Sequence, residues 1–416
     1  MNQFARFKIS GNFLAFFLIV LSNIGSVYAQ ENTAARKLEF NAGIAEKVAY
    51  DDNIFLKRDK THDFINSVTP SFDFTYNDQN PVWSASGGYL VDIVNYFDYG
   101  ENDYLRHAPS ASFVFHTPVN LYGSFDENYN NTADPYGSDD HYGEGRKTRR
   151  NNNKVDFTIG YELSSHLALE GAYINNIYRF YKEEDKWRNK DDNAFSSSLV
   201  YKLTPKTSAL FTYRQTGTIF PEQNDGIAGW SSSTSEDTTK REYTTGFRIS
   251  SHGKLSGSLM MGYESQNFEN EVDRYGHQYT DISDWSASVD LQFKATQKNQ
   301  VNLTLERKIR PSNTIEASSQ EDTSLMIGYT QNLMHSFVFI LAAGWDLWDY
   351  KMFNELALPE KKITIYSAKT GINYIIREWL TTGIIYEYRT KNASSDQYNE
   401  EEYVDNVAAF TISATY

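Results

Sequence analysis

Apolar and polar residues alternate with a period of two along many segments of this chain. Residues 301–306 are Val-Asn-Leu-Thr-Leu-Glu, and residues 285–294 alternate in the same way. This period predicts β-strands whose two faces meet different surroundings. The polar face of 285–294 carries Asp290 and Lys294, and a dry protein core would not accept such charges without partners. The pattern therefore predicts strands with one apolar face and one wet face.

Eight short breaks rich in turn-forming residues join these segments at intervals of roughly forty residues. They lie at 77–81, 117–120, 164–165, 204–206, 251–254, 296–299, 332–336 and 376–379. Between them are longer polar stretches at 126–153, 219–241, 269–279, 352–360 and 391–401. Tight turns alternating with long loops are typical of outer-membrane β-barrels, in which the turns are periplasmic and the loops extracellular.

The eight turns define sixteen strands, and one further strand at each end, 38–53 and 402–416, raises the expected total to eighteen. We therefore predict an all-β, transmembrane antiparallel barrel of about eighteen strands, with sixteen as the alternative. An even number places both chain ends on the periplasmic side. Two elements have the weakest sequence signals: the loop within 95–105, and the strand at 319–333, whose apolar face is short.

The last predicted strand alternates up to the final residue, with apolar side chains at Ala408, Phe410, Ile412, Ala414 and Tyr416. A terminal aromatic residue resembles the C-terminal signal of outer-membrane barrels, although Tyr replaces the usual Phe and Ala414 stands where an aromatic is usual. A soluble β-sandwich or propeller would also alternate. It would have to bury charged residues such as Arg214 and Glu306 between packed sheets, which disfavours that alternative.

The overall composition is compatible with a barrel. A mean hydropathy of −0.58 is expected when only every second residue faces lipid, because the lumen-facing residues lower the average. Arg6 and Lys8 precede an apolar run at 13–21 and Val-Tyr-Ala at 27–29, which predicts a cleaved secretory signal at 1–29; a retained anchor is the alternative. We then expect a short periplasmic segment at 30–37 and the barrel at 38–416, with the mature protein in the outer membrane.

One opening segment carries a family resemblance. Residues 49–55 are Ala-Tyr-Asp-Asp-Asn-Ile-Phe, followed by Asp63-Phe64 and Val68-Thr69-Pro70, and this resembles the start of the beta-barrel porin 2 family. Members are outer-membrane barrels often associated with exopolysaccharide and capsule production. The resemblance implies a conduit with no catalytic residues, plausibly for secreted polysaccharide. Beyond this opening, only the general architecture matches.

Strand parity assigns one set of charged side chains to the wet face. These candidate lumen-lining residues are Arg214, Arg248, Glu264, Asp290, Lys294, Glu306, Lys308, Glu387 and Arg389. One interpretation is that the two signs of charge select solutes, as charged rings do in channels. The other is that each residue pairs with a neighbour across strands and stiffens the wall.

The remaining sequence patterns give weaker evidence for a binding or catalytic site. The acidic stretch 126–153 could supply oxygen ligands for calcium but lacks a regular ligand spacing, so we expect no metal and no cofactor. Residues 146–150 are Arg-Lys-Thr-Arg-Arg, which suits either lipopolysaccharide contact or a solvated charge run. Adjacent Ser165 and His166 should point apart, and no catalytic motif is present, so we expect no enzyme. A net charge of −15 disfavours nucleic acid.

The function expected from these observations is a passive outer-membrane porin for secreted polysaccharide or smaller polar solutes. A non-conducting barrel that serves as an adhesin or assembly scaffold through its acidic, aromatic loops is the main alternative, and a barrel hydrolase is a distant third. The expected partners are outer-membrane lipid, lipopolysaccharide, the barrel assembly machinery and, for polysaccharide, periplasmic export components. Whether loops plug the lumen is left open.

Overall fold

The computed structural model describes residues 38–77, 83–133, 148–250, 253–312, 314–334 and 336–416, and these form one closed sheet of eighteen antiparallel strands. Each strand pairs with the next along the chain, and β18 pairs with β1. The first nine strands are β1 (Leu38–Asp51), β2 (Asp63–Asn77), β3 (Trp83–Tyr96), β4 (Tyr104–His116), β5 (Leu121–Thr132), β6 (Arg150–Glu162), β7 (Leu167–Phe180), β8 (Lys190–Thr204) and β9 (Thr207–Ile219). The other nine are β10 (Thr238–Ile249), β11 (Leu255–Phe268), β12 (Ile282–Thr296), β13 (Asn299–Pro311), β14 (Ala317–Leu333), β15 (Phe337–Met352), β16 (Lys362–Arg377), β17 (Leu380–Ala393) and β18 (Tyr403–Thr415). The prediction of an eighteen-stranded barrel is confirmed.

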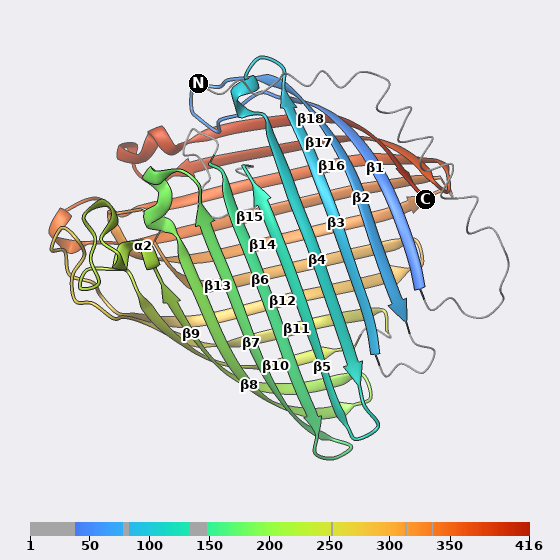
Figure 1. Cartoon of the computed structure of the whole chain (residues 1–416), viewed down its shortest axis with the longest axis horizontal. Coiled ribbons are helices and arrows are strands. Elements are labelled where there is room, and N and C mark those ends of the chain that lie inside the picture. Colours follow the sequence, from blue (N-terminus) through green and yellow to red (C-terminus); the bar gives the residue numbers. More distant parts are fainter. Residues whose placement is uncertain (1–37, 78–82, 134–147, 251–252, 313, 335) are drawn as a thin grey trace.

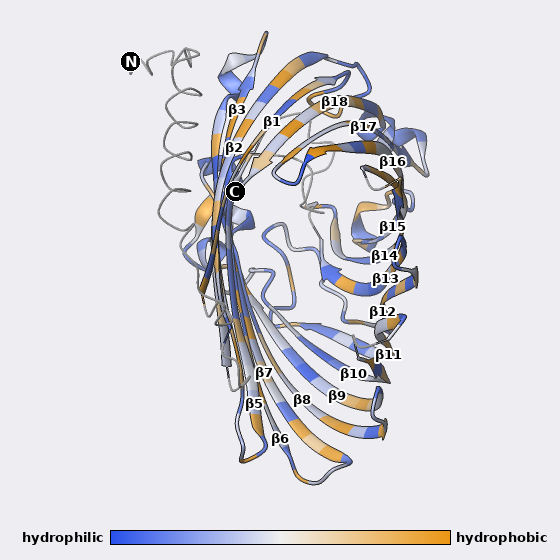
Figure 2. Ribbon diagram, turned by 90° about the vertical axis from the view of Figure 1, so that its right-hand side faces the viewer, coloured by the Kyte–Doolittle hydropathy of each residue, from blue (hydrophilic) through white to orange (hydrophobic). Residues whose placement is uncertain are grey.

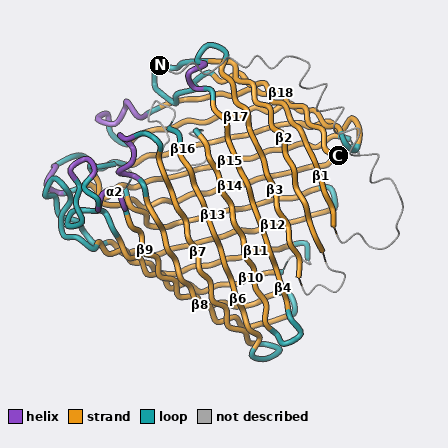
Figure 3. Tube along the Cα trace, viewed as in Figure 1, coloured by secondary structure: helices purple, strands orange, loops and turns teal. Residues whose placement is uncertain are grey.

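The two ends of the barrel differ, as the sequence predicted. The strands that flank all eight expected breaks are paired, and they meet at the end where β1 also begins and β18 ends (Figure 1). Residues 78–81, 251–252 and 335 of these breaks lie outside the described residues. The short helical segments gather at the opposite end, in the upper left of Figure 3. They are η1 (Gly100–Asn102), η2 (Glu183–Arg188), α2 (Pro221–Asn224), η3 (Ile227–Gly229), η4 (Asn354–Leu356) and η5 (Asp396–Glu401). We call these the turn end and the loop end.

The stretch 126–153 is shorter as a loop than its polar composition predicted. Strand β5 continues to Thr132 and β6 begins at Arg150, with Asn131 opposite Asn151 and Tyr129 opposite Asn153. Asparagine has a low strand propensity, which is why the sequence alone suggested a loop here. Backbone pairing of β5 with β4, and of β6 with β7, nevertheless extends both strands into this asparagine-rich stretch. Residues 134–147, and the predicted signal peptide and periplasmic segment at 1–37, lie outside the described residues.

The outer face of the barrel carries large apolar side chains in the open. Met261, Tyr263 and Trp285 are more than half exposed, and apolar and polar residues alternate along the strands in Figure 2. Aromatic residues recur on this face eight positions apart: Phe64 and Phe72, Trp285 and Phe293, Phe337 and Trp345, Tyr366 and Tyr374. Eight residues span roughly 26 Å along a strand, which corresponds to a height of roughly 20 Å for strands tilted by about 40°, somewhat less than the ~25 Å apolar band of transmembrane barrels.

The opposite face of each strand is the interior. Arg248 of β10 forms an ion pair with Glu170 of β7, and Lys240 of β10 donates to the backbone oxygen of Ile309 in β13. Neither pair of strands is adjacent in the sheet, so these side chains can meet only across the concave face. Among the described residues, no helix has the length and apolar character needed to cross a membrane.

A charge placed on the outer face should destabilise the barrel more than a charge placed inside. Val289 lies midway between Trp285 and Phe293, opposite Leu259 and Leu305, whereas its neighbour Ser288 lies opposite Glu306. We expect Val289→Arg to lower the free energy of unfolding in phospholipid vesicles by about 2–4 kcal/mol, because a guanidinium would lie in the middle of the hydrocarbon. Ser288→Arg is the matched control and should cost much less. Equal losses would contradict the assignment of the two faces.

Candidate functional site

The strand register places all nine sequence-predicted lumen candidates on the interior face. Six of them form ion pairs: Arg214 with Glu242 (3.6 Å), Arg248 with Glu170 (2.8 Å), Glu264 with Lys240 (3.3 Å), Glu306 with Lys308, and Glu387 with Lys369 (2.7 Å). Asp290 lies opposite Ser258 and Thr304, Lys294 opposite Gln300, and Arg389 opposite Ser367 and Asp405. Acidic and basic residues are therefore interleaved along the wall, and most of the pairs bring together candidates with residues that the sequence analysis did not select.

One cluster ties strands together across the interior. Both terminal guanidinium nitrogens of Arg248 donate to Glu170, at 2.8 and 3.0 Å, and the Tyr122 hydroxyl donates to the same carboxylate at 2.9 Å. Tyr122 lies opposite Gly160, where a Cβ atom would fall 2.3 Å from its ring, so glycine makes room for the ring. Bidentate pairing holds two groups in a defined geometry. We call Tyr122, Glu170 and Arg248 the interior brace.

Sequence parity predicted Arg248 but missed its two partners. Glu170 follows Leu167, Ala168 and Leu169, so its place on the polar face could have been assigned from the alternation. No local pattern, however, connects residue 170 with residue 248, because β8 and β9 lie between their strands. Ala168, Val200, Leu210 and Met260 form a small apolar cluster, and two of its members line the same cavity as Glu170 and Arg248.

A cavity of about 340 Å³ lies at the interior brace. Glu170, Arg248, Arg214 and Glu242 contribute charge to its lining, and Leu210 and Met260 contribute apolar surface. Hydroxyl groups surround them, from Thr158, Ser196, Ser198, Thr212, Thr244, Ser258 and Ser288. A second cavity of about 230 Å³ is lined by Lys369, Glu387, Arg389 and Asp405 on the other wall. Such linings suit hydrated polar solutes, since most of the lining side chains offer a hydrogen bond or a charge, beside some apolar surface.

The wall bends inward near the loop end of β13. Pairing between β12 and β13 stops at Ala287 and Arg307, although β13 continues to Pro311. The Ile309 backbone therefore loses its β12 partner, and interior side chains replace it: Glu264 accepts from the Ile309 amide, and Lys240 donates to its carbonyl at 3.1 Å. Ile309 is almost fully buried. The loop ends of β13 and β14 therefore lie closer to β10 and β11, and the lumen is narrower there.

Four loops form a hydrogen-bonded cap at the mouth. We call loops 181–189, 220–237, 269–281 and 353–361 the loop cap. Gln223 donates to the Trp187 carbonyl (2.9 Å), and Asn270 donates to the Ser235 carbonyl (3.0 Å). The His277 ring lies 5.1 Å from that of Phe353. These contacts join the four loops to one another, so they should open together.

A buried carboxyl lies within the loop cap. Glu236 is 7 % exposed; its amide donates to Gln223, and its carboxyl accepts from the same side chain at 3.2 Å. Burial raises the pKa of Glu236 to about 7; the Gln223 hydrogen bond and Arg274 act against this, and Asp273 adds to it. Since burial disfavours the charged form, ionisation of Glu236 weakens the packing around it.

Other loops also enter the mouth. Ile54 and Leu56 are 1 % exposed, and Ile54 packs with Val94 and Tyr96. At the loop ends of β16 and β17, Lys361 and Lys391 both bind Glu401, at 2.6 and 3.2 Å. Ordered contacts are therefore present in the loops at this part of the loop end as well.

Two arrangements with possible chemistry are weak as sites. Carboxylate oxygens of Asp51, Asp52 and Asp405 lie within 4.8 Å of one another, but Asp51 accepts from the Asn53 amide and Asp52 binds Lys60 and Asn406. Ser165 and His166 were expected to point apart, and this was wrong: Ser165 Oγ lies 2.8 Å from His166 Nδ1. Both sit in an exposed turn, where β6 has ended and the strand rule no longer applies.

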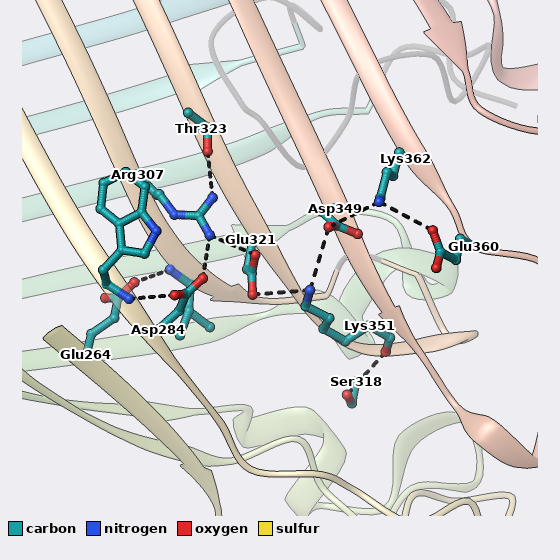
Figure 4. Close-up of polar contacts among 12 residues, drawn as sticks. Glu264, Asp284, Arg307, Ser318, Glu321, Thr323, Asp349, Lys351, Glu360 and Lys362 are labelled. Atoms are coloured by element: carbon teal, nitrogen blue, oxygen red, sulfur yellow. Dashed lines mark hydrogen bonds and ion pairs between the residues drawn. The ribbon is translucent and has the colours of Figure 1, made fainter.

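A ladder of charged residues crosses β13–β16 near the loop end, and Asp284, opposite Glu264 at the start of β12, joins it (Figure 4). Arg307 binds Asp284 and Glu321, Lys351 binds Glu321 and Asp349, and Lys362 binds Asp349 and Glu360. The Arg307 guanidinium also lies 4.7 Å from the Trp285 ring centroid. The ladder lies beyond the aromatic girdle, where lipid headgroups or water can solvate it.

No protein-family model matches this chain, and no curated protein matches it. The resemblance at residues 49–70 therefore stays a prediction. Solved structures that resemble this chain include three proteins of Pseudomonas aeruginosa. OprD is 11 % identical over 94 % of this chain and 98 % of its own (TM-score 0.42), and OccK5 (OpdH) is 9 % identical over 91 % and 98 % (TM-score 0.45). The outer membrane protein OpdK is 7 % identical over 91 % and 98 % (TM-score 0.44).

The raised pKa of Glu236 predicts a pH-dependent loop cap. With the pKa raised from 4.5 to about 7, the closed cap should be most stable below pH 4.5, lose stability as the pH rises to about 7, and stay constant above that. Amide hydrogen exchange in 220–237, corrected for intrinsic rates, should be faster at pH 7.5 than at pH 5. Glu236→Gln should remove the difference, because glutamine does not ionise. An equal pH effect in both proteins would contradict this assignment.

Proposed function

We propose that this chain is an outer-membrane porin-like channel that lets small polar solutes pass through a charged, water-filled lumen. The observation that carries the proposal is the contrast between the two faces of the closed sheet. Exposed aromatic and aliphatic side chains cover the outside, whereas hydroxyl and charged groups line cavities inside. A barrel of this strand number is wide enough for an aqueous channel.

The size of the interior cavities favours small solutes over a polymer. The interior brace joins β10 to β7, and the Glu264 contact with Ile309 joins β11 to β13, so both place side chains inside one part of the wall. The cavities of about 340 and 230 Å³ lie at or below the lower end of small-molecule pockets, roughly 300–1,000 Å³. A polysaccharide chain would require the brace and the loop cap to move aside. Export of polysaccharide, suggested by the opening segment, is therefore the narrower form of the proposal, with periplasmic export components as partners.

A second candidate is a non-conducting barrel that presents its loops as an adhesin or scaffold. The observation that favours it is the loop cap, in which four loops hydrogen-bond or pack against one another. In both cases we propose insertion by the barrel assembly machinery and contact with outer-membrane lipid, including lipopolysaccharide. Neither candidate requires a cofactor or enzymatic chemistry.

Conductance in planar bilayers separates the two candidates. We expect the purified, refolded protein to give discrete conductance steps, because the interior face is polar along its length. Two results together would contradict the transport proposal. The first is a purified barrel that is folded and inserted yet carries no current, and the second is an unchanged amount of surface polysaccharide in a strain that lacks the gene. Normal polysaccharide with open channels would leave the small-solute form intact.

Replacing interior cations should change ion preference. We expect Arg248→Gln combined with Lys308→Gln to shift the reversal potential in a salt gradient toward cations, since two positive charges leave the lumen. Lys351→Gln with Lys362→Gln removes the same charge from the outer-face ladder and is the matched control. If the two double variants behaved alike, the lumen charges would have no role in selectivity.

A further inference from the structure

The outer aromatic girdle is interrupted on one part of the wall. On β12 and β16, the residue eight positions from the aromatic at the turn end is another aromatic, Trp285 or Tyr366. On β6 and β8, the same count from Tyr161 and Tyr201 reaches Asn153 and Asn193. Asn175 of β7 lies directly opposite Asn193. Three adjacent strands thus carry amides where other strands carry rings.

The amides and neighbouring tyrosines form a connected outer surface. Asn193 Oδ1 accepts from Asn175 (3.0 Å) and from the Tyr173 hydroxyl (2.8 Å), and the Tyr173 ring packs on Phe195 at 4.8 Å. Phe195 is 62 % exposed, which places this group on the outside of the barrel. We call Asn131, Asn151, Asn153, Asn175 and Asn193, with Tyr173 and Tyr181, the asparagine patch; Asn131 is itself buried and supports Asn151 and Tyr181 through hydrogen bonds.

A second tier lies closer to the loop end. Asn131 donates to Asn151 Oδ1 (2.6 Å) and to the Tyr181 hydroxyl (2.7 Å), and Tyr181 donates to Asn151 (2.8 Å). The Arg149 guanidinium lies 5.3 Å from the half-exposed Tyr181 ring. Arg150, also part of the predicted basic cluster, is instead buried, and it donates to the Thr148 carbonyl. Arg149 alone among the described residues of that cluster borders the patch.

The chemistry of the patch suits a hydroxylated partner. Amides both donate and accept hydrogen bonds, and tyrosine rings offer apolar faces beside a polar hydroxyl. Asn153 and Asn193 lie at positions where other strands carry outward-facing aromatic rings, so their amides face the same neighbour as those rings. Formal charge is sparse here: the patch itself has none, and Arg179 beside it is paired with Asp191 at 2.6 Å. The charge ladder on β13–β16, by contrast, is made of charged side chains.

We propose that the asparagine patch on β5–β8 binds the sugar headgroup of a glycolipid in the outer leaflet. The inference rests on the proposed function, because it requires that the loop end faces outward in the outer membrane. At the height of an aromatic girdle, the neighbour of the wall is the lipid headgroup layer. Sugar hydroxyls complete the hydrogen bonds of the amides, and the tyrosines border the sugar rings. The patch thereby fixes the rotational position of the barrel relative to its lipids.

Binding of purified lipopolysaccharide to the detergent-refolded full chain tests this. The variant Asn153→Leu/Asn175→Leu/Asn193→Leu should bind about tenfold more weakly or worse, because three amides lose their hydrogen bonds. Thr364→Leu/Thr390→Leu/Asn392→Leu, on β16 and β17, is the control for adding leucine to the outer face and should bind normally. Phosphatidylglycerol, which supplies phosphate without a comparable sugar, should not compete.

Three results would overturn the proposal: unchanged affinity in the asparagine variant, equal losses in both variants, or displacement by phosphatidylglycerol. Heat-modifiable migration in gels checks that each variant is folded. Planar-bilayer conductance of the same preparations separates this inference from the proposed function. A conducting barrel that does not bind lipopolysaccharide refutes the patch alone, whereas a binding barrel without conductance refutes the channel alone.

Discussion

The structure depends on closing the ring of backbone hydrogen bonds. Nine residue pairs between β1 and β18, from Gly43 with Thr415 to Asp51 with Val407, join the two ends of the sheet, so the sheet closes on itself. In hydrocarbon an unpaired N–H or C=O group is too costly to persist, which restricts spanning structures to helices and closed barrels. Closure also gives every strand one inner and one outer face, and the two-residue alternation of the sequence follows from it.

Charge inside the barrel is compatible with stability because it is paired and hydrated. The interior brace connects β5, β7 and β10, and Lys240 with Glu264 satisfies the Ile309 backbone where β13 leaves β12. These contacts narrow a lumen that the strand number alone would make wide. The loop cap acts at the mouth and the brace acts within, so passage of a solute requires both to accommodate it.

Local patterns in the sequence were sufficient to predict strand number, turn positions and wall parity, because each depends on neighbours within a few residues. The sparsely marked strand at 317–333 was found where expected. Contacts between distant strands were not predictable: nothing near Glu170 points to Arg248, and nothing near Ile309 points to Glu264. The stretch 126–153 was interpreted as a long loop because asparagine disfavours strands, yet part of it forms the asparagine patch.

The central claim is that one face of every strand meets water and the other meets lipid. The chain has no cysteine, so single cysteines at successive positions from 285 to 293 can be tested in phospholipid bilayers with a charged, water-soluble thiol reagent. The structure predicts labelling at even positions, such as 286, 288 and 290, and protection at odd positions, such as 287, 289 and 291. Labelling without a two-residue period, or protection of both sets, would contradict it.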